Sequence, residues 1–376
     1  MKNAPDFIIV CFIRRNFVIT LHSVSTERLQ MSNFSDFDPN GASNPTNNIY
    51  GFPITEDEAK LVILPVPWEV TVSFTAGTSR ATEHIFKASM HVDVFDADYP
   101  HTWRKGYYLR PPDKKILMKS DYLRKEAELY IDYISRGEEL KKNAFMCKSL
   151  KDINEGGIFL NNWVYEQTKS LINKGKMVAL LGGDHSISFG YLKAIAEKHG
   201  NFGILQIDAH CDLRKSYEHF VYSHASVMYN ALAEIPQIQK LVQVGIRDYS
   251  QEEWDFILSS NNRVTTFFDR HIKEKLFEGQ NWKMIADDII NQLPEKIYLS
   301  FDIDGLDPKL CPNTGTPVPG GFELEQIYYL VKKMIESGRT LIGFDLVEVG
   351  IGETGWDSNV GARILLKLCN LLAAGN

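Results

Sequence analysis

The sequence predicts an α/β fold, a three-layer α/β/α sandwich with a mostly parallel, doubly wound sheet. From Leu61 onward, short apolar runs alternate with amphipathic segments of helical length. The order strand, helix, strand repeats along the chain, which is typical of parallel strands joined by crossover helices. With 376 residues, of which 44% are hydrophobic, the chain can bury a core of the size that such a sandwich requires.

Seven apolar runs have the length and composition of strands. In chain order they are residues 61–66, 177–183, 202–208, 241–246, 263–268, 296–304 and 341–349. The segments between them show helical periodicity, notably residues 186–198, 225–232, 282–292, 324–337 and 360–372. Residues 113–150 are charged, helical in pattern and without a strand, so we interpret them as a helical insertion in the domain.

The N-terminal 48 residues differ from the rest. The run 7–21 is apolar, but Arg14 and Arg15 interrupt it and no clean cleavage site follows, so it is a poor membrane span or targeting segment. A polar stretch begins at Met31, and residues 1–30 are either an untranslated upstream extension or a disordered tail. We therefore expect an extension over residues 1–48, outside the fold, and one domain over residues 49–376, with no membrane partner.

The charge and the cysteines limit the partners and the compartment. Forty-one basic and 48 acidic residues give a net charge of −7, without a basic stripe, which argues against a nucleic-acid partner and favours a small cationic substrate. Five scattered cysteines, none in a C-x-x-C pair, indicate neither a disulfide framework nor a zinc knuckle. A reducing cytoplasm is the simplest location.

Three predicted strands end in clusters of carboxylates and imidazoles. LLGGDHS allows a tight turn and then places Asp184 and His185, and QIDAHCD spaces two aspartates and a histidine at alternate positions. SFDIDGLDP spaces two more aspartates in the same way. The carboxyl ends of parallel strands meet at one edge of the sheet, so these side chains should converge there. In an extended segment, alternate positions share one face, which leaves Cys211 on the opposite face as a packed thiol. The strand-end residues of the last two motifs are Asp208, His210, Asp212, Asp302 and Asp304.

So many acids in one place are costly unless a cation lies among them. Imidazole and carboxylate ligands without a thiolate suit Mn²⁺, Fe²⁺, Co²⁺, Ni²⁺ or Zn²⁺, and the number of ligands fits two ions better than one. Each motif alone has an ordinary structural explanation: Gly-Gly-Asp is often a turn, and Asp-x-Asp is often a solvated loop. The conjunction of three predicts a metal centre.

The three blocks GGDHS, DAHCD and SFDIDGLDP resemble the signature blocks of the ureohydrolase (arginase/agmatinase) family. The resemblance runs from about Leu61 to the C-terminus, and the segment VPWEVTVSFTAGTSR is closer to agmatinases than to arginases. It implies an arginase-like fold, two metal ions that are usually Mn²⁺, with Ni²⁺ as the alternative, and a homotrimer or homohexamer. It also implies that one ion is held by His185, Asp208, Asp212 and Asp302, and the other by Asp208, His210, Asp302 and Asp304.

The resemblance further implies roles in catalysis and substrate binding. His224, in YSHAS, matches a proton-shuttling histidine that also lies at the substrate, although the residue that follows is Ala225 where glycine is common. Glu348, in DLVEVG, matches the carboxylate that binds the guanidinium group. Asp212 would stabilise the tetrahedral intermediate. Without the resemblance, His224 could equally be a helix cap and Glu348 a surface residue at a strand end.

The substrate stays open at this point. Hydrolysis of agmatine to putrescine and urea is the expected activity, and guanidinase is the first alternative, because Trp68, Phe220 and Trp356 could fill the space that a longer substrate would need. Trp356, with Asn359 and Arg363, lies in a segment that departs from the family pattern, and we predict that it contacts substrate. Formiminoglutamase is a third possibility. A noncatalytic metal- or guanidine-binding sensor on the same fold is a hypothesis of a different class.

Overall fold

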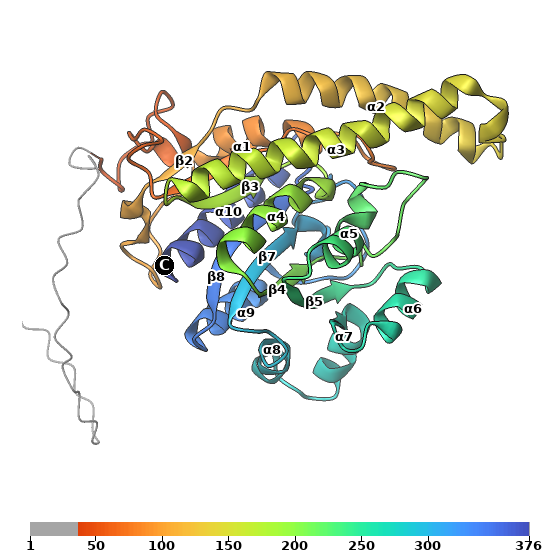
Figure 1. The fold of residues 1–376 in the computed structure, drawn as a ribbon. Coiled ribbons are helices and arrows are strands. Elements are labelled where there is room, and N and C mark those ends of the chain that lie inside the picture. Colours follow the sequence, from red (N-terminus) through yellow and green to blue (C-terminus); the bar gives the residue numbers. More distant parts are fainter. Residues whose placement is uncertain (1–36, 376) are drawn as a thin grey trace, which may run out of the picture. The chain divides into compact units, whose positions relative to one another are not determined.

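The structure is a computed structural model that describes residues 37–375, so the prediction for residues 1–30 lies outside the described residues. Its centre is an eight-stranded sheet in the order β2-β1-β3-β8-β7-β4-β5-β6, and every strand pair is parallel (Figure 1). The strands are β1 (Leu61–Pro65), β2 (Tyr107–Leu109), β3 (Met177–Leu181), β4 (Phe202–Ile207), β5 (Ile238–Ile246), β6 (Val264–Phe268), β7 (Lys296–Asp302) and β8 (Thr340–Val347).

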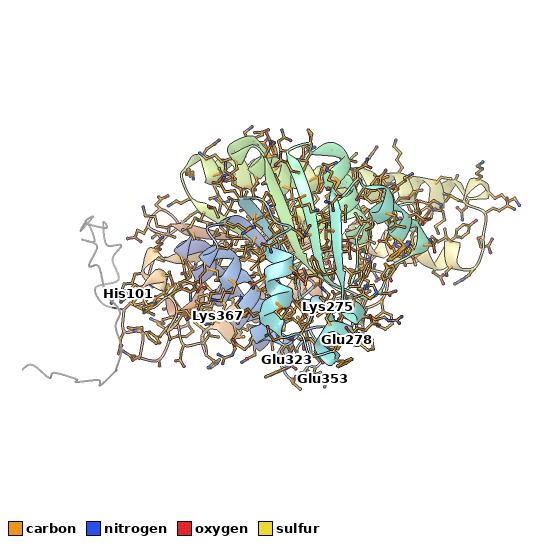
Figure 2. All side chains as sticks on the ribbon, turned by 90° about the horizontal axis from the view of Figure 1, so that it is seen from below. His101, Lys275, Glu278, Glu323, Glu353 and Lys367 are labelled. Carbon is orange, nitrogen blue, oxygen red and sulfur yellow. The ribbon has the colours of Figure 1, made fainter. Side chains whose placement is uncertain are left out.

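The sheet has a hydrophobic core on each face, because successive side chains of a strand point to opposite sides. In β1, Leu61 and Ile63 join one core, whereas Val62 and Leu64 join the other. Helices cover both cores. Figure 2 shows all side chains on the ribbon, and four of the labelled residues are exposed: His101, Glu278, Glu323 and Glu353. The α/β/α sandwich with a parallel sheet is therefore confirmed.

Ten α-helices in the described part of the chain form the two outer layers. One core is packed against α1 (Ala81–Ser89), α7 (Asp269–Phe277), α8 (Trp282–Ile290), α9 (Leu324–Glu336) and α10 (Trp356–Ala374). The other is packed against α2 (Lys114–Ser135), α3 (Ala144–Asn173), α4 (Ser188–His199), α5 (Val227–Glu234) and α6 (Gln251–Ser259). Among these residues, no helix has both the length and the apolar character that a bilayer crossing demands.

Some elements differ from the sequence prediction. The sequence analysis does not predict four elements: strand β2 and helices α1, α6 and α7. Strand β2 has three residues, which are too few to show a pattern. Helix α6, in contrast, begins with a capping box between Ser250 and Glu253, a signal that the sequence does contain. The predicted insertion, residues 113–150, covers α2 and the start of α3, but α3 continues to Asn173 and buries Leu160 and Val164 against the sheet. These two helices are thus part of the outer layer.

The predicted boundary of the extension at residue 48 is too late. The ring of Phe37 lies 5.3 Å from that of Phe52 and 5.5 Å from that of Trp103. Asn48 continues the sheet at its edge: its side-chain amide donates to the carbonyl of Leu109 at 3.1 Å, and its Oδ1 accepts from the Leu109 amide at 2.7 Å. Residues 37–48 therefore contact the domain. Burial of the apolar ring of Phe37 is favourable, and Asn48 supplies hydrogen bonds to backbone groups at the edge of β2 that would otherwise be unpaired.

Candidate metal centre

The predicted metal ligands and the predicted substrate-binding Glu348 lie at the carboxyl ends of four neighbouring strands. His185 follows β3, Asp208 follows β4, Asp302 ends β7 and Glu348 follows β8, and these strands are adjacent in the order β3-β8-β7-β4. From β4 the chain winds outward through β5 and β6, whereas from β7 it winds in the opposite direction to β8. The winding therefore reverses between the neighbouring strands β4 and β7. Open parallel sheets bind their ligands at such a position.

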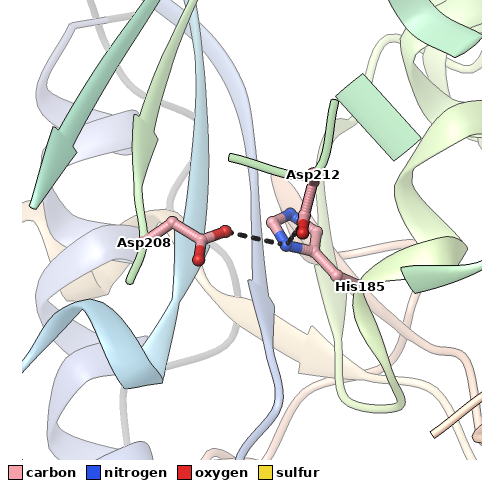
Figure 3. Close-up of side chains that lie close together, drawn as sticks. All are labelled: His185, Asp208 and Asp212. Atoms are coloured by element: carbon pink, nitrogen blue, oxygen red, sulfur yellow. Dashed lines mark ion pairs between the residues drawn. The ribbon is translucent and has the colours of Figure 1, made fainter. Parts of the chain in front are cut away.

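A first group of side chains surrounds His185. Its Nδ1 lies 2.9 Å from an oxygen of Asp212, 3.2 Å from one of Asp208 and 3.4 Å from one of Asp302. Figure 3 shows Asp208 and Asp212 converging on the imidazole from two sides. All four side chains are buried, so they are withdrawn from water together.

A second group surrounds His210, whose Nδ1 lies 3.0 Å from Asp304 and 3.6 Å from Asp208. Within each of the groups His185, Asp208, Asp212 and Asp208, His210, Asp304, the candidate ligand atoms lie within 4.8 Å of one another. Asp208 belongs to both groups, through Oδ2 in the first and Oδ1 in the second. The arrangement therefore matches two neighbouring cation sites with a shared carboxylate.

The backbone aims the carboxylates at the centre. Asp302 accepts the Asp304 amide with Oδ1, and Asp304 accepts the Ala209 amide with its own Oδ1, each at 2.9 Å. These bonds leave the Oδ2 atoms facing the histidines, and Asp304 Oδ2 and His185 Nδ1 have no hydrogen-bond partner among the described residues. Buried polar atoms without partners are costly, and a coordinated cation would satisfy them.

The electrostatics also fit a cation. Burial raises the pKa of Asp212 to about 7, helped by the charge of Asp208, and it raises the pKa of Asp302 well above its ordinary value. Burial lowers the pKa of His185, but the carboxylates of Asp208, Asp212 and Asp302 outweigh burial and raise it overall. Without metal, the centre therefore holds protons where positive charge is needed, and divalent ions would supply that charge.

The positions of the ligands depend on turns that the extended-strand argument did not include. Strand β4 ends at Ile207, and Asp212 takes a left-handed conformation with φ 54°, which turns its side chain toward His185. Asp304 lies in a 3₁₀ turn, Ile303–Gly305, and not in a strand. Gly183, with φ 79°, admits no Cβ, which would lie 2.5 Å from the carbonyls of Val66 and Trp68. The convergence was predicted correctly, but the reason was incomplete. Cys211 is buried in the apolar core, as predicted.

A buried chain of hydrogen bonds fixes the ring of His185. Its Nε2 lies 2.8 Å from Ser300 Oγ, and Ser300 in turn donates to Asp345 at 3.0 Å. Asp345 also accepts the hydroxyl of Tyr298 at 2.6 Å and the amide of Phe301 at 3.0 Å. With Nε2 donating to Ser300, Nδ1 keeps its lone pair for a metal, which is the usual task of such outer partners.

A cavity of about 290 Å³ opens beside the centre. His210 and Asp212 lie in its wall with His224, whose Nδ1 is 3.2 Å from Thr71 Oγ1. Burial lowers the pKa of His224 to about 3, and the positive charges of His210 and His185 add to this, so the imidazole is neutral at pH 7. The rest of the wall is formed by Ser73, Phe74, Arg214, Tyr217, Ala225, Asp248, Glu253, Thr316, Pro317 and Val318.

Glu348 lies within the centre. It is 4% exposed, with φ 59°, and its Oε1 accepts the backbone amide of His185 at 2.9 Å. Its Oε2 has no hydrogen-bond partner among the described residues, and burial, together with the nearby charge of Asp184, raises the pKa of Glu348 well above its ordinary value. The surface-residue explanation for Glu348 is therefore wrong.

The aromatic residues proposed from the sequence do not lie at the cavity. Trp356 is 46% exposed at the start of α10, where its indole N–H donates to the carbonyl of Lys309. Trp68 and Phe220 are buried in the core beneath α2 and α3. None of the three lines the cavity, so they do not narrow it as the guanidinase hypothesis requires. The predicted substrate contact of Trp356 stays a prediction.

Other residues of the centre were missed. Thr71 lies in a segment that the resemblance covers, but only the structure places it against His224, 153 positions further along the chain. Ser300 and Asp345 are polar residues inside strands that are otherwise apolar, a signal that the sequence does contain. Asp248 follows β5, one strand beyond the ligand-bearing ends, and its carboxylate could not be assigned to the cavity without the strand order.

Comparisons with known proteins agree with the centre. Residues 59–368 match the Arginase family. The chain is 30% identical over 294 residues to N(1)-aminopropylagmatine ureohydrolase of Thermus thermophilus, covering 78% of this chain and 83% of that protein. It is 30% identical over 219 residues to a guanidinobutyrase of Pseudomonas aeruginosa, covering 56% of this chain and 65% of that protein.

The fold is also similar to solved structures. The agmatine ureohydrolase of Thermoplasma volcanium superposes with a TM-score of 0.64 at 21% identity, covering 85% of this chain and 92% of that one. At this identity the likeness concerns the architecture alone. The family match over most of the chain, together with the ureohydrolase relatives, carries the assignment: the chain belongs to the arginase family and is a hydrolytic enzyme that acts on guanidino compounds.

Proposed function

We propose that this protein hydrolyses agmatine to putrescine and urea with the help of two divalent metal ions. The observation that carries the proposal is the pair of ligand groups that share Asp208, directly beside the cavity that His210, Asp212 and His224 line. His185, Asp208, Asp212 and Asp302 would hold one ion, and Asp208, His210, Asp302 and Asp304 the other. When bound, the ions supply a water molecule that is ionised near neutral pH.

The residues of the chain would bind the substrate and move its protons. The buried Glu348, with its unpartnered Oε2, can accept from a guanidinium group. The carboxylate of Asp212 can accept from the O–H and N–H groups of the carbon once it is tetrahedral. His224 lines the same cavity in its neutral form, so it can take a proton from the attacking water and pass that proton to the leaving amine. In this mechanism, proton transfer and substrate binding depend on different side chains.

The size and charge of the cavity favour a substrate with a cationic tail. Its volume of about 290 Å³ is much greater than free guanidine needs, since a water molecule occupies about 30 Å³ in the liquid. The carboxylate of Asp248 makes no hydrogen bond or ion pair with another described residue, whereas Glu253 is already bonded to Leu213 and Ser250. We propose that Asp248 binds the terminal ammonium group of agmatine, and that Phe74 and Tyr217 contact the methylene chain.

A urea-release screen tests the proposal. Metal-free protein would be loaded with Mn²⁺ or with Ni²⁺ and assayed with agmatine, guanidinobutyrate, arginine and guanidine, with ammonia release from formiminoglutamate measured in parallel. We expect the highest kcat/KM with agmatine and a metal content of two ions per chain. Activity with guanidine alone would contradict the proposed substrate, and a metal content near zero after loading would contradict the binuclear centre. The screen also decides between Mn²⁺, our first choice, and Ni²⁺.

The setting of the enzyme also stays a proposal. The four cysteines in the described part of the chain are free thiols, and Cys147 is exposed, which supports a reducing compartment such as the cytoplasm. The homotrimer or homohexamer implied by the family remains a prediction, and light scattering of the purified protein would measure it.

A further inference from the structure

Helices α2 and α3 form a hairpin that contacts two loops around the cavity. The helices lie side by side on one face of the sheet (Figure 1). Leu123 of α2 packs directly against Gly156 of α3, where a Cβ would clash with the leucine side chain. The first loop, residues 66–77, carries Thr71 and Phe74. The second, residues 213–223, leads into His224. Neither helix contributes a residue to the cavity wall.

Arg124 of α2 connects the hairpin to the first loop. Its side chain is 14% exposed, and Nη1 donates to the carbonyls of Val70, at 3.3 Å, and Val72. One turn earlier, Ser120 Oγ accepts the amide of Glu69 at 3.1 Å. A guanidinium group suits this task, because it is planar and always charged, and it can donate to two carbonyls at once. The two carbonyls flank Thr71, so Arg124 fixes the backbone on both sides of this residue.

Thr71 transmits this constraint to His224. Its hydroxyl accepts the backbone amide of His224 at 3.1 Å and lies 3.2 Å from His224 Nδ1. The same hydroxyl and the Thr71 amide each donate to the buried Asp184 at 3.4 Å. With Nδ1 held by Thr71, Nε2 is the ring nitrogen left for the cavity. The side chain of His224 is thus oriented by a residue whose backbone Arg124 holds.

The hairpin holds the second loop as well. The hydroxyl of Tyr130 lies 2.7 Å from His219 Nδ1, and Asn154 of α3 accepts the amide of Val221 at 2.8 Å and donates to the carbonyl of His219 at 3.3 Å. Glu218 and His219 have φ angles of 51° and 66°, conformations that are unfavourable for residues other than glycine. Strained backbone persists only where its surroundings fix it, and here the surroundings are α2 and α3.

We propose that Arg124 is a positioning residue for the hydrolysis, which acts through Thr71 to orient His224. The inference rests on the proposed function, because it takes His224 as the group that carries protons. The α2–α3 hairpin, although it contributes no residue to the cavity wall, then contributes to the rate by holding both loops in position. Small displacements of a proton-transferring group are costly, because the transfer requires hydrogen-bond distance.

The test replaces Arg124 in the metal-loaded enzyme. Arg124→Met keeps the aliphatic packing and removes every donor, so we expect kcat to fall by about 10- to 100-fold with an unchanged metal content. Arg124→Lys keeps one charged donor and should lose less. Arg136→Met is the matched control, because Arg136 lies at the exposed end of the same helix and pairs with Asp132; its kcat should equal that of the wild type.

Two further measurements separate positioning from general damage. In a His224→Ala background, Arg124→Met should change kcat less than twofold, because its effect passes through the missing imidazole. Hydrogen exchange of the peptide covering residues 66–76 should accelerate in Arg124→Met and not in Arg136→Met, without any substrate. If Arg124→Met does not fold, Arg124→Lys carries the same comparisons.

The outcomes distinguish this inference from the proposed function. A wild-type enzyme that hydrolyses no guanidino compound would refute the proposed function and, with it, the role of His224. With an active wild type, an unchanged kcat in Arg124→Met overturns the inference. The inference is also overturned if Arg124→Met lowers kcat by the same factor with and without His224, since Arg124 would then act on the scaffold as a whole.

Discussion

Replacing Ser300 by alanine should weaken metal binding without touching a metal ligand. Ser300 stands between His185 Nε2, at 2.8 Å, and Asp345, at 3.0 Å. After the substitution, Asp345 keeps its bonds from Tyr298 and from the Phe301 amide, so its carboxylate stays satisfied. The loss therefore falls on the imidazole, whose Nε2–H has no acceptor left and whose orientation is no longer fixed.

The magnitude follows from the position of Ser300. Loss of an outer partner of a metal-bound histidine typically weakens metal binding about 10- to 100-fold. At about 1.4 kcal/mol per factor of ten, this is about 1.4 to 2.8 kcal/mol of binding free energy. It agrees with the cost of about 1 to 3 kcal/mol for one buried donor left without a partner. The effect should concern the ion that His185 holds.

Chelator competition with metal-free protein would measure the two dissociation constants. We expect Ser300→Ala to weaken one of them and to leave the other, at His210 and Asp304, within a factor of about three. Ser358→Ala is the control, because the Ser358 hydroxyl is equally buried but has no hydrogen-bond partner among the described residues. Wild-type affinity for both ions in Ser300→Ala would refute the reasoning, since it would mean that Ser300 does not set the ring of His185.

Three further predictions concern catalysis, pH and the N-terminus. His224→Ala should lower kcat about 100-fold at unchanged metal content, since His224 is not a ligand; a near-normal kcat in steady-state assays would make it structural. Burial raises the pKa of Asp212 to about 7, so the folded, metal-free chain binds this proton more tightly than the unfolded chain does. Its stability should then fall as the pH rises from about 4 to about 7, and the Tm gained on adding metal should grow over that range; a constant gain would contradict this. Deletion of residues 1–30 should leave Tm unchanged, whereas deletion of residues 1–48 should lower Tm, because it removes the contacts of Phe37 and Asn48. Equal Tm values for the two deletions would show that these contacts do not contribute to stability.

Much of the fold could be predicted because its signal is local. The apolar run at residues 61–66 and the helical pattern at residues 324–337 correspond to β1 and α9 within a residue or two. The elements that were missed have weak local signals. Strand β2 has three residues and is completed by Asn48, and the packing of Phe37 on Phe52 and Trp103 depends on partners far along the chain.

The ligands could be predicted for a similar reason, and their surroundings could not. His185, Asp208 and Asp302 lie at strand ends in short motifs, and parallel topology alone brings such ends together. Thr71 and Ser300 act through residues 153 and 115 positions away, and nothing in the local sequence marks those partners. Trp356 shows the limit of an argument from a divergent segment: its indole donates to the carbonyl of Lys309 at the surface, and its predicted contact with substrate stays a prediction.

The strand order has a consequence for how metal binding and folding are linked. Strands β3 and β4 are consecutive in the chain but separated in the sheet by β8 and β7, so His185 and Asp208 are brought to within 3.2 Å only with those two strands in place between their own. Asp302 ends β7, and Glu348 follows β8 and binds the amide of His185. The first ligand group therefore forms only in the complete sheet, and the unfolded chain has no comparable site. Binding of the ions must then stabilise the whole sheet, by an amount that grows with the free metal concentration relative to the dissociation constant.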